Sequence, residues 1–549
     1  MSVRGLTGWL FVLLLVANAA KAASTLDKID KAQREGRLAA EAAILLKVQA
    51  LKGAKTLPEE YRADQAIPER CGTRVTSEAV ENWDSYSPAT QAALRQALAR
   101  PLQQKNHTSP ESFFLIHYDT AGSQAVPLTD LDASGVPDYV ENLARYADSS
   151  HRMEVMQLGY RPPPFDPDSL YDIYTQEIDY YGYAQPESSG PEPWGDFTSY
   201  IVVHRNFLGF PPNNDPDGNQ KGAMKVTIAH EFHHAVQFAY SASTAAHIWF
   251  MEITSTWMEE VVFDPVDDNY NYLPYFFNIE PYLPLTNTGI HMYASFIWNQ
   301  YLAQNFGRDI IRQVWEQNRL SNSIQALNLI LQGLGTDLGK EFSRFAVWNF
   351  YTGIRDDGQH YEEGINYPDM FLSPHFSFKD SGRSRSILPL AALYEAFRSA
   401  ATIEKARLTF TGRPIGIWNA QVVLNNPFTI RVYPFNLVNN NTGDTVFFGL
   451  DSFPQMVLIA AQIKTSQLST VEYFDYTYKA FPFFIRGDLN EDLAVNSADI
   501  VYQINYVFLG ILPPENRLEA ADLNCDGGLS AADLVRLLNL VYLSLSPSC

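Results

Sequence analysis

Apolar residues in the first part of the chain recur mostly at helical spacing. This period runs from about residue 24 to 57, returns over 77–102, and is strongest from about 226 to 334. A short apolar run at 113–118 instead has the length and residue types of a strand. Helices mixed with short strands between Pro, Gly and Asn loops predict an α+β domain in the middle of the chain.

The pattern changes to strict alternation between residues 386 and 484. Short alternating runs such as 406–410, 428–433 and 455–463 are separated by Asn, Gly and Pro. Alternation of this kind predicts strands with one face buried, and several in succession predict a β-sandwich-like domain.

The N-terminus has the pattern of a secretory signal peptide. Arg4 is followed by an apolar run over 5–16, and Ala20-Lys21-Ala22 supplies small residues at the cleavage positions. The run is shorter than the roughly 20 residues that a membrane-spanning helix needs. We therefore expect residues 1–22 to be removed, the protein to be secreted, and no later segment to span a membrane.

Composition narrows the class of protein further. The 549 residues include 40 Lys+Arg and 62 Asp+Glu, a formal net charge of −22, which argues against nucleic acid as a partner. Hydrophobic residues make up 46%, enough to form the cores of several domains. Three cysteines are too few for a disulfide-based fold; Cys525 and Cys549 are the expected pair, and Cys71 is left single with no indicated role.

The strongest chemical motif lies in the long helical stretch. His230-Glu231-Phe232-His233-His234 is an HExxH sequence whose flanks continue the helical pattern. Residues four apart share a helix face, so His230 and His234 can both bind one Zn²⁺, with Glu231 beside them as general base. His233 is expected to pack or to face solvent, as is His247 further along.

A third ligand follows on the next predicted helix. Glu252 comes after His234 with 17 residues between, and it is surrounded in sequence by Trp249, Ile253 and Trp257. An unpaired carboxylate in such apolar surroundings is costly, and a metal ion removes that cost. Glu259, on nearly the same face, is expected to support the ligands from outside.

These motifs resemble known metallopeptidases. HExxH followed by a Trp-x-x-Glu helix is similar to the gluzincins, which include thermolysin and the aminopeptidase N family, and more closely resembles a family of secreted bacterial metalloproteases. The resemblance covers roughly residues 110–380 and is carried by four segments: His117–Gly122, Gly135–Glu141, His230–Gln237 and Trp249–Glu260.

The resemblance implies a zinc site of His230, His234 and Glu252, with an open fourth position for a water molecule whose proton Glu231 accepts. It also implies an oxyanion-stabilising residue downstream, for which Tyr293 is the candidate and His291 the second choice. The exopeptidase Gly-x-Met-Glu-Asn motif has no acceptable match, which favours an endopeptidase.

The last 65 residues contain an internal duplication with a period of 34. Each copy places oxygen-bearing side chains at positions 1, 3, 5, 9 and 12 of a loop that leads into an apolar helix, the pattern of a calcium loop. Position 6 is Gly527 in the second copy but Leu493 in the first, so the first site is expected to be weaker. The predicted ligands are Asp488, Asn490, Asp492, Asn496 and Asp499, then Asp522, Asn524, Asp526, Ser530 and Asp533.

A calcium loop followed by one helix, given twice, resembles a type I dockerin. The resemblance implies Ca²⁺ as a cofactor and a cohesin-bearing scaffold or cell surface as a partner. A third oxygen-rich loop lies in the middle domain and has the same spacing, although Pro137 within it is unusual. An aspartate-capped turn before a helix is the alternative there; the possible ligands are Asp130, Asp132, Ser134, Asp138 and Glu141.

The leading hypothesis is a secreted zinc endopeptidase tethered by a dockerin, acting on protein or peptide substrates. The alternatives are a dockerin-bearing enzyme of polysaccharide catabolism and a catalytically silent binding module on a cell surface. Whether the N-terminal region is a removed pro-segment or a docking element is left open. The predicted parts are a signal peptide (1–22), a helical or pro-like region (23–105), a metallopeptidase domain (106–385), a β-sandwich-like domain (386–484) and a dockerin (485–549).

Overall fold

The computed structural model describes residues 24–63, 69–164, 169–241, 243–375, 383–398, 403–465, 472–490, 492, 494–511 and 518–545. The predicted signal peptide and Cys549 lie outside these residues. Contacts divide the chain into two compact units, Met1–Glu341 with Trp348–Met370, and Phe342–Val347 with Phe371–Cys549. Each unit is described by itself below.

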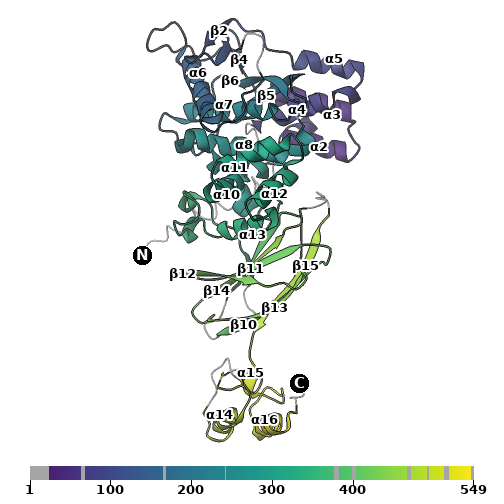
Figure 1. The fold of residues 1–549 in the computed structure, drawn as a ribbon, viewed down its shortest axis with the longest axis vertical. Helices are drawn as coiled ribbons and strands as arrows, with labels where there is room; N and C mark the ends of the chain where they lie inside the picture. Colours follow the sequence, from purple (N-terminus) through teal and green to yellow (C-terminus); the bar gives the residue numbers. More distant parts are fainter. Residues whose placement is uncertain are drawn as a thin grey trace. The chain divides into compact units, whose positions relative to one another are not determined.

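The first unit contains a mixed sheet of six strands in the order β1-β5-β6-β4-β3-β2 (Figure 1). Strands β3, β4 and β6 run parallel, β5 is antiparallel to β6, and β1 at the edge is parallel to β5. The strands are β1 (Glu69–Cys71), β2 (Lys105–Thr108), β3 (Phe114–Tyr118), β4 (Tyr171–Gln176), β5 (Tyr180–Ser189) and β6 (Phe197–His204).

The helices of this unit form an N-terminal group, which packs on the sheet, and a later group, of which the first two contact the strands and the others pack on helix 244–263 or on one another. The first group is α2 (Thr25–Arg34), α3 (Ala40–Lys52), α4 (Thr73–Glu81) and α5 (Pro88–Ala97). The second group is α6 (Asp138–His151, continued as a π-helix over Arg152–Gln157), α7 (Asn219–Phe238), α8 (Thr244–Phe263), α9 (His291–Ala294), α10 (Ile297–Phe306), α11 (Asp309–Asn318) and α12 (Ser323–Gly333). Helix α13 (Leu338–Trp348) is divided between the two units.

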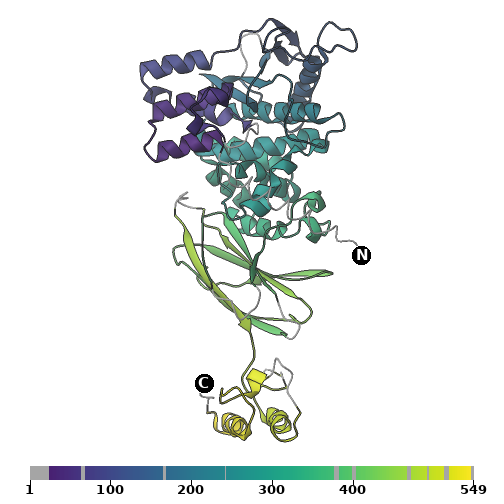
Figure 2. The ribbon, with the colours of Figure 1, turned by 180° about the vertical axis from the view of Figure 1, so that it is seen from behind.

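The N-terminal helices share a hydrophobic core with the sheet. Side chains of α2–α5 cluster with those of the central strands, among them Leu26, Ile44, Val48, Val75, Leu94, Tyr174, Tyr183, Tyr200 and Val202. Figure 2 shows these helices grouped beside the sheet. The region predicted as helical or pro-like over 23–105 is thus built into the first unit, and its removal as a pro-segment stays a prediction.

Helix α7 packs on the sheet through Phe232. The ring of Phe232 makes edge contacts with Phe114 of β3 and Tyr171 of β4, with centroids 5.2 and 6.2 Å away. Strand β5 and helix α7 also approach each other closely at Gly182, where an added Cβ would lie 2.9 Å from Cγ of Glu231. Helices α7 and α8 run side by side in both views (Figures 1 and 2), and this pair carries the predicted zinc ligands.

The second unit contains two sheets around one core. Their orders are β13-β10-β15-β8 and β12-β11-β14-β9-β7. The strands are β7 (Ser373–His375), β8 (Arg383–Ile387), β9 (Ala391–Arg398), β10 (Lys405–Gly412), β11 (Trp418–Asn426), β12 (Thr429–Phe435), β13 (Thr442–Phe448), β14 (Gln455–Gln462) and β15 (Phe474–Pro482). Strand pairing therefore starts at β7, ahead of the predicted domain boundary at 386.

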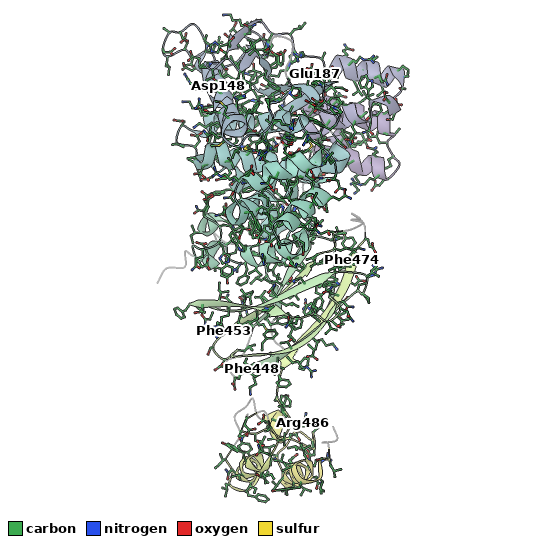
Figure 3. The ribbon with its side chains drawn as sticks, in the orientation of Figure 1. Asp148, Glu187, Phe448, Phe453, Phe474 and Arg486 are labelled. Atoms are coloured by element: carbon green, nitrogen blue, oxygen red, sulfur yellow. The ribbon has the colours of Figure 1, made fainter. Side chains whose placement is uncertain are left out.

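Alternating burial is found in strands of the sandwich such as β15, whereas β14, for which the sequence predicts alternation over 455–463, is buried on both faces. Along β15, Phe474, Tyr476 and Tyr478 are buried while Asp475 and Thr477 are exposed. Both sheets contribute to one cluster of buried side chains, which includes Phe453 and Phe474 (Figure 3).

Three helices follow in the same unit: α14 (Ser497–Phe508), α15 (Leu518–Ala521) and α16 (Ala531–Leu543). Helices α14 and α16 start with the same capping box, Asn496 with Asp499 and Ser530 with Asp533. The sequence duplication is therefore repeated in the local structure.

Candidate metal centre

Helices α7 and α8 bring the three predicted zinc ligands together. His230 and His234 turn their Nε2 atoms toward each other, 3.1 Å apart. Oε2 of Glu252 lies 3.3 Å from Nε2 of His230 and 3.6 Å from Nε2 of His234. All three side chains are buried.

These separations match the edges of a zinc coordination shell. Zinc bonds to nitrogen and oxygen of about 2.0–2.2 Å at tetrahedral angles place the ligand atoms about 3.3–3.6 Å apart. Oε1 of Glu252 is buried and has no hydrogen-bond partner, although such an atom normally finds one. Two imidazoles and a carboxylate facing one point are thus a set of donors that fits zinc.

Neighbouring side chains orient both imidazoles. With Nε2 turned to the centre, Nδ1–H of His230 donates to Oε1 of Glu259 at 2.7 Å. Nδ1–H of His234 donates to Oε1 of Gln237 at 2.8 Å. Gln237 is itself fixed, because its amide donates to the carbonyl of Met251 on α8. Outer contacts of this kind hold metal ligands in position.

Burial and ion pairing set the charges in this cluster. Burial opposes charge on Glu252, but His234 and His230 outweigh it and lower the pKa of Glu252 to about 2. Burial also opposes charge on His230, whereas Glu252 and Glu259 raise its pKa to about 9. The Glu252 carboxylate is therefore ionised, the form in which it binds a metal.

Glu231 lies beside the ligands and contacts the N-terminal region. Its Oε2 accepts a hydrogen bond from Oγ1 of Thr73 at 2.9 Å. The same hydroxyl oxygen accepts from the backbone N–H of Ala184 at 2.8 Å. Burial raises the pKa of Glu231, against the opposing effect of the two histidines. A carboxyl group with a raised pKa next to a metal site is suited to exchanging protons.

Cys71 is a member of the cluster that sequence reasoning missed. Its Sγ, one nitrogen each of His230 and His234, and one oxygen of Glu252 all lie within 4.8 Å of one another. Cys71 is buried and free. The sequence suggested that zinc would have an open fourth position for water, whereas the structure places the thiol of Cys71 beside the three predicted ligands. Cys71 was missed because it reaches Glu231 across 160 positions of sequence, and no local pattern marks it.

Arg70 fixes the strand that carries Cys71. Its guanidinium is buried and pairs with Glu259 and with Asp268. Its charge also lies over the rings of Tyr181 and Tyr272, 4.6 and 5.2 Å from their centroids. Because Glu259 also binds His230, Arg70 connects the Cys71 strand to a predicted zinc ligand.

The candidate oxyanion residue lies near the centre. The ring of Tyr293 is 6.3 Å from that of His230. His291 instead hydrogen-bonds Ser295 through Nδ1, at 3.1 Å, and packs on Phe276. Of the two candidates, Tyr293 is the one whose ring is in contact with a predicted ligand.

The other two histidines of the region are occupied elsewhere. Nδ1 of His233 is 2.8 Å from Oε2 of Glu154. Nδ1 of His247 is 2.8 Å from Oγ of Ser323. Both histidines are buried, in agreement with the packing role expected for them.

The acidic loop before α6 brings together part of its predicted ligand set. Oxygens of Asp130, Asp132 and Asp138 lie within 4.8 Å of one another. The backbone N–H of Ser134 donates to Asp130 and Asp132, at 3.0 and 3.1 Å. Glu141 is not in this group of acids, so calcium at this loop stays a prediction.

The two C-terminal loops have matching internal contacts. In the first loop, the N–H of Asp492 donates to Asp488 and to Asn490, at 3.1 Å each. In the second loop, the N–H of Asp526 donates to Asp522 at 3.2 Å and to Asn524 at 3.0 Å. The side-chain amide at position 3 also donates to the carboxylate at position 5, at 2.9 Å in the first loop and 2.7 Å in the second, so the side chains at positions 1, 3 and 5 lie together in both copies.

The last predicted ligands of each loop close it from the helix side. Oδ1 of Asp499 accepts from the N–H of Leu489 at 2.7 Å, and Oδ1 of Asp533 accepts from the N–H of Asn524 at 3.0 Å. Gly527 has a φ of 83°, a conformation that position 6 of a calcium loop requires. Cys525 is disulfide-bonded; its predicted partner Cys549 lies outside the described residues.

Comparison with protein families gives two matches. Residues 218–356 match a model described as "Family of unknown function (DUF6055)", so a DUF6055 domain is present, and it contains α7, α8 and Tyr293. Residues 486–541 match the "Dockerin type I domain". No curated protein matches the chain.

The dockerin confirms the C-terminal prediction. It implies Ca²⁺ binding and a cohesin partner, and proteins with dockerins are typically extracellular and associated with cell surfaces. Within the described part of the chain, no helix combines the length and apolar character needed to cross a bilayer. The family of residues 218–356 carries no assigned activity, so the chemistry of the metal centre has to be argued from its geometry.

Proposed function

We propose that the protein is a secreted zinc-dependent endopeptidase that is tethered through its dockerin to a cohesin-bearing scaffold. The observation that carries this proposal is the convergence of His230 Nε2, His234 Nε2 and Glu252 Oε2 on one point, with separations of 3.1–3.6 Å. Two histidines and a glutamate are the ligand set of several zinc peptidases.

Zinc bound by these residues would act as a Lewis acid toward a peptide carbonyl and would lower the pKa of water. The protein's own part is to hold the ligands rigidly and to move a proton. Glu231 is placed for the second task, because its carboxylate lies beside the ligands and is oriented by Thr73. It accepts a proton from the attacking water and gives it to the departing amine.

Tyr293 is assigned to the developing oxyanion. Tyr293 is carried by α9, and its ring lies next to that of His230. A phenol hydroxyl is a hydrogen-bond donor suited to a tetrahedral intermediate. Glu259 and Gln237 are positioning residues, since they act through the imidazoles that they orient.

The dockerin helices present apolar side chains to solvent at equivalent positions of the duplication. Val501 and Val535 are 58% and 54% exposed, and Phe508 and Tyr542 are 61% and 66% exposed. Exposed apolar patches of this kind are typical of protein interfaces. We assign cohesin binding to these helix faces.

A second candidate is a catalytically silent module in which the metal is structural. The position of Cys71 beside the three predicted ligands favours it, because closed four-ligand zinc sites are structural and catalytic ones keep a position open. Polysaccharide cleavage needs a pair of catalytic carboxylates instead, and no such pair was singled out from the sequence.

Proteolysis assays separate these candidates. The full chain and a Cys71→Ser variant are incubated with casein, then treated with a chelator and reloaded with zinc. The endopeptidase proposal expects internal cleavage by at least one of the two proteins, loss of cleavage with the chelator and recovery with zinc. Zinc bound to both proteins without cleavage of casein or gelatin by either would favour the silent module.

A further inference from the structure

We propose that the thiolate of Cys71 is the fourth protein ligand of the zinc ion in the conformation seen here, so that the N-terminal region holds the centre in a closed, latent state. This inference rests on the zinc site of the proposed function and adds a regulatory feature to it.

The sulfur belongs to the same cluster of donor atoms as the three other ligands. One donor atom from each of Cys71, His230, His234 and Glu252 lies within 4.8 Å of the others. All four side chains are buried, and Cys71 is 3% exposed. A sulfur ligand at about 2.3 Å from zinc completes a tetrahedral Cys-His₂-Glu shell.

Burial and the nearby carboxylates of Glu231 and Glu252 raise the pKa of the Cys71 thiol, so the sulfur becomes a thiolate here only when a cation is bound to it. The backbone N–H of Thr73 donates to Sγ of Cys71 at 3.3 Å, and such hydrogen bonds are common at metal-bound sulfurs. The free oxygen Oε1 of Glu252 is buried without a partner. This second observation is independent of the cysteine, and a cation bound by the cluster would satisfy the oxygen.

The cysteine is held in place on both sides along the chain. Before it, Arg70 pairs with Glu259, which binds His230. After it, Thr73 binds Glu231. In strand β1, Cys71 is paired with Gly182 of β5. The short segment 70–73 therefore contacts a ligand-orienting residue, the sulfur position and the proposed base at once.

Closure follows from the number of ligands. Catalytic zinc keeps one position for water or substrate, and four protein ligands leave none. Binding of Cys71 releases its thiol proton to solvent. Opening the site reverses this step: the thiolate leaves, takes up a proton, and the vacated position becomes available. The rest of the N-terminal region can stay on the sheet, where its helices are part of a hydrophobic core.

The test uses the full chain with Co²⁺ in place of zinc, because cobalt bound by a thiolate has a sulfur-to-metal charge-transfer band. We expect the band at one equivalent of cobalt in the wild type and its loss in Cys71→Ser, with cobalt still bound. Thr76→Val is the matched control. Thr76 is buried in the same region, and its hydroxyl donates to the carbonyls of Thr73 and Ala184. Neither of these hydrogen bonds reaches a predicted ligand, so its variant should keep the band.

X-ray absorption of the zinc-loaded wild type makes the test independent of any variant's folding. We expect one sulfur neighbour at about 2.3 Å. A zinc shell without sulfur, or a charge-transfer band that persists in Cys71→Ser, would overturn the inference.

Casein hydrolysis then separates this inference from the proposed function. We expect Cys71→Ser to cleave casein at least about tenfold faster than the wild type, since a weaker, displaceable ligand replaces the thiolate. Sulfur ligation without cleavage by either protein would leave Cys71 as a zinc ligand but refute both the latent state and the peptidase. Chelator-sensitive cleavage by a wild type whose zinc has no sulfur ligand would support the peptidase and overturn the inference about Cys71.

Discussion

Nδ1 of His230 and Oε1 of Glu259 lie 2.7 Å apart, in the interior of the first unit. The other oxygen of Glu259 pairs with Arg70. One carboxylate therefore orients a predicted zinc ligand and anchors the strand that ends in Cys71. This relationship couples the metal centre to the N-terminal region.

Replacing this carboxylate is expected to weaken metal binding. A Glu259→Gln variant keeps the shape of the side chain but loses its negative charge. That charge makes the imidazole of His230 more basic and so a stronger zinc ligand. Changes at such outer contacts typically cost about 10–100-fold in metal affinity, so we expect the zinc dissociation constant to rise by that factor in competition with a chromophoric chelator.

Glu260→Gln is the matched control for this prediction. Glu260 follows directly on α8 but hydrogen-bonds Asn269 and contacts no predicted ligand. Its variant should bind zinc like the wild type. Equal affinities for all three proteins would show that Glu259 does not support the centre.

Tyr293→Phe removes the hydroxyl of a ring whose centroid lies 6.3 Å from that of His230. Because loss of an oxyanion donor costs about 10²–10³-fold in kcat, we expect a decrease of this size in the peptidase-active form, with KM and zinc content almost unchanged. Tyr272→Phe tests the neighbouring ring, whose centroid is 5.8 Å from that of Tyr293, and should retain activity. Steady-state kinetics on a peptide substrate measure both variants. Equal kcat values for Tyr293→Phe and Tyr272→Phe would refute the oxyanion role of Tyr293.

Glu260 is expected to make the stability of the first unit depend on pH. Burial, followed by the nearby acids Glu363 and Asp264, raises the pKa of Glu260 to about 9. A carboxyl group with a raised folded pKa favours its neutral form, so stability falls as the pH rises from the unfolded pKa of about 4.5 toward 9.

The Glu260→Gln variant removes this titration. We expect it to have a free energy of unfolding about 1–3 kcal/mol above the wild type at pH 8, with a difference that shrinks toward pH 4. Denaturant unfolding in buffer without added calcium measures both values. A difference that is constant over this range would mean that Glu260 does not titrate as its burial implies.

Calcium is expected to bind the second dockerin loop more tightly than the first. Gly527 occupies position 6 of the second loop with a φ of 83°, whereas Leu493 stands there in the first. Calorimetric titration of the full chain in calcium-depleted buffer should resolve the two dockerin sites, with affinities that differ by about tenfold or more.

Single-site variants assign these two affinities. Asp533→Ala should remove the tighter site and Asp499→Ala the weaker one, because each aspartate closes its own loop. The opposite assignment, or two equal sites, would contradict the role given to Gly527.

Local patterns in the sequence predicted the elements that carry the site. The helical spacing around HExxH corresponds to α7, and the alternating run over 455–463 corresponds to β14 (Gln455–Gln462). The type and place of both elements were predicted correctly, but the one-sided burial expected for the 455–463 run is wrong, because β14 lies between β11 and β9 and is buried on both faces from Met456 to Gln462. The convergence of His230, His234 and Glu252 was also predictable, since two adjacent helices with short separation pack side by side.

Contacts between distant segments were beyond such patterns. Arg70 meets Asp268 across 198 positions and Cys71 meets Glu231 across 160. The sequence identified helices at the N-terminus, but their packing on the sheet depends on tertiary contacts with residues such as Tyr183 and Tyr200. For the same reason the closed side of the metal centre was not foreseen.

The central claim, a zinc ion that Glu231 uses for hydrolysis, is tested most directly by two proteins. Cys71→Ser and Cys71→Ser with Glu231→Gln are compared by mass-spectrometric zinc analysis and casein cleavage on the same preparations. We expect about one zinc per chain in both, with cleavage by the first and a rate at least about 10²-fold lower for the second. Zinc in both proteins with equal cleavage rates, or with no cleavage by either, would contradict the account.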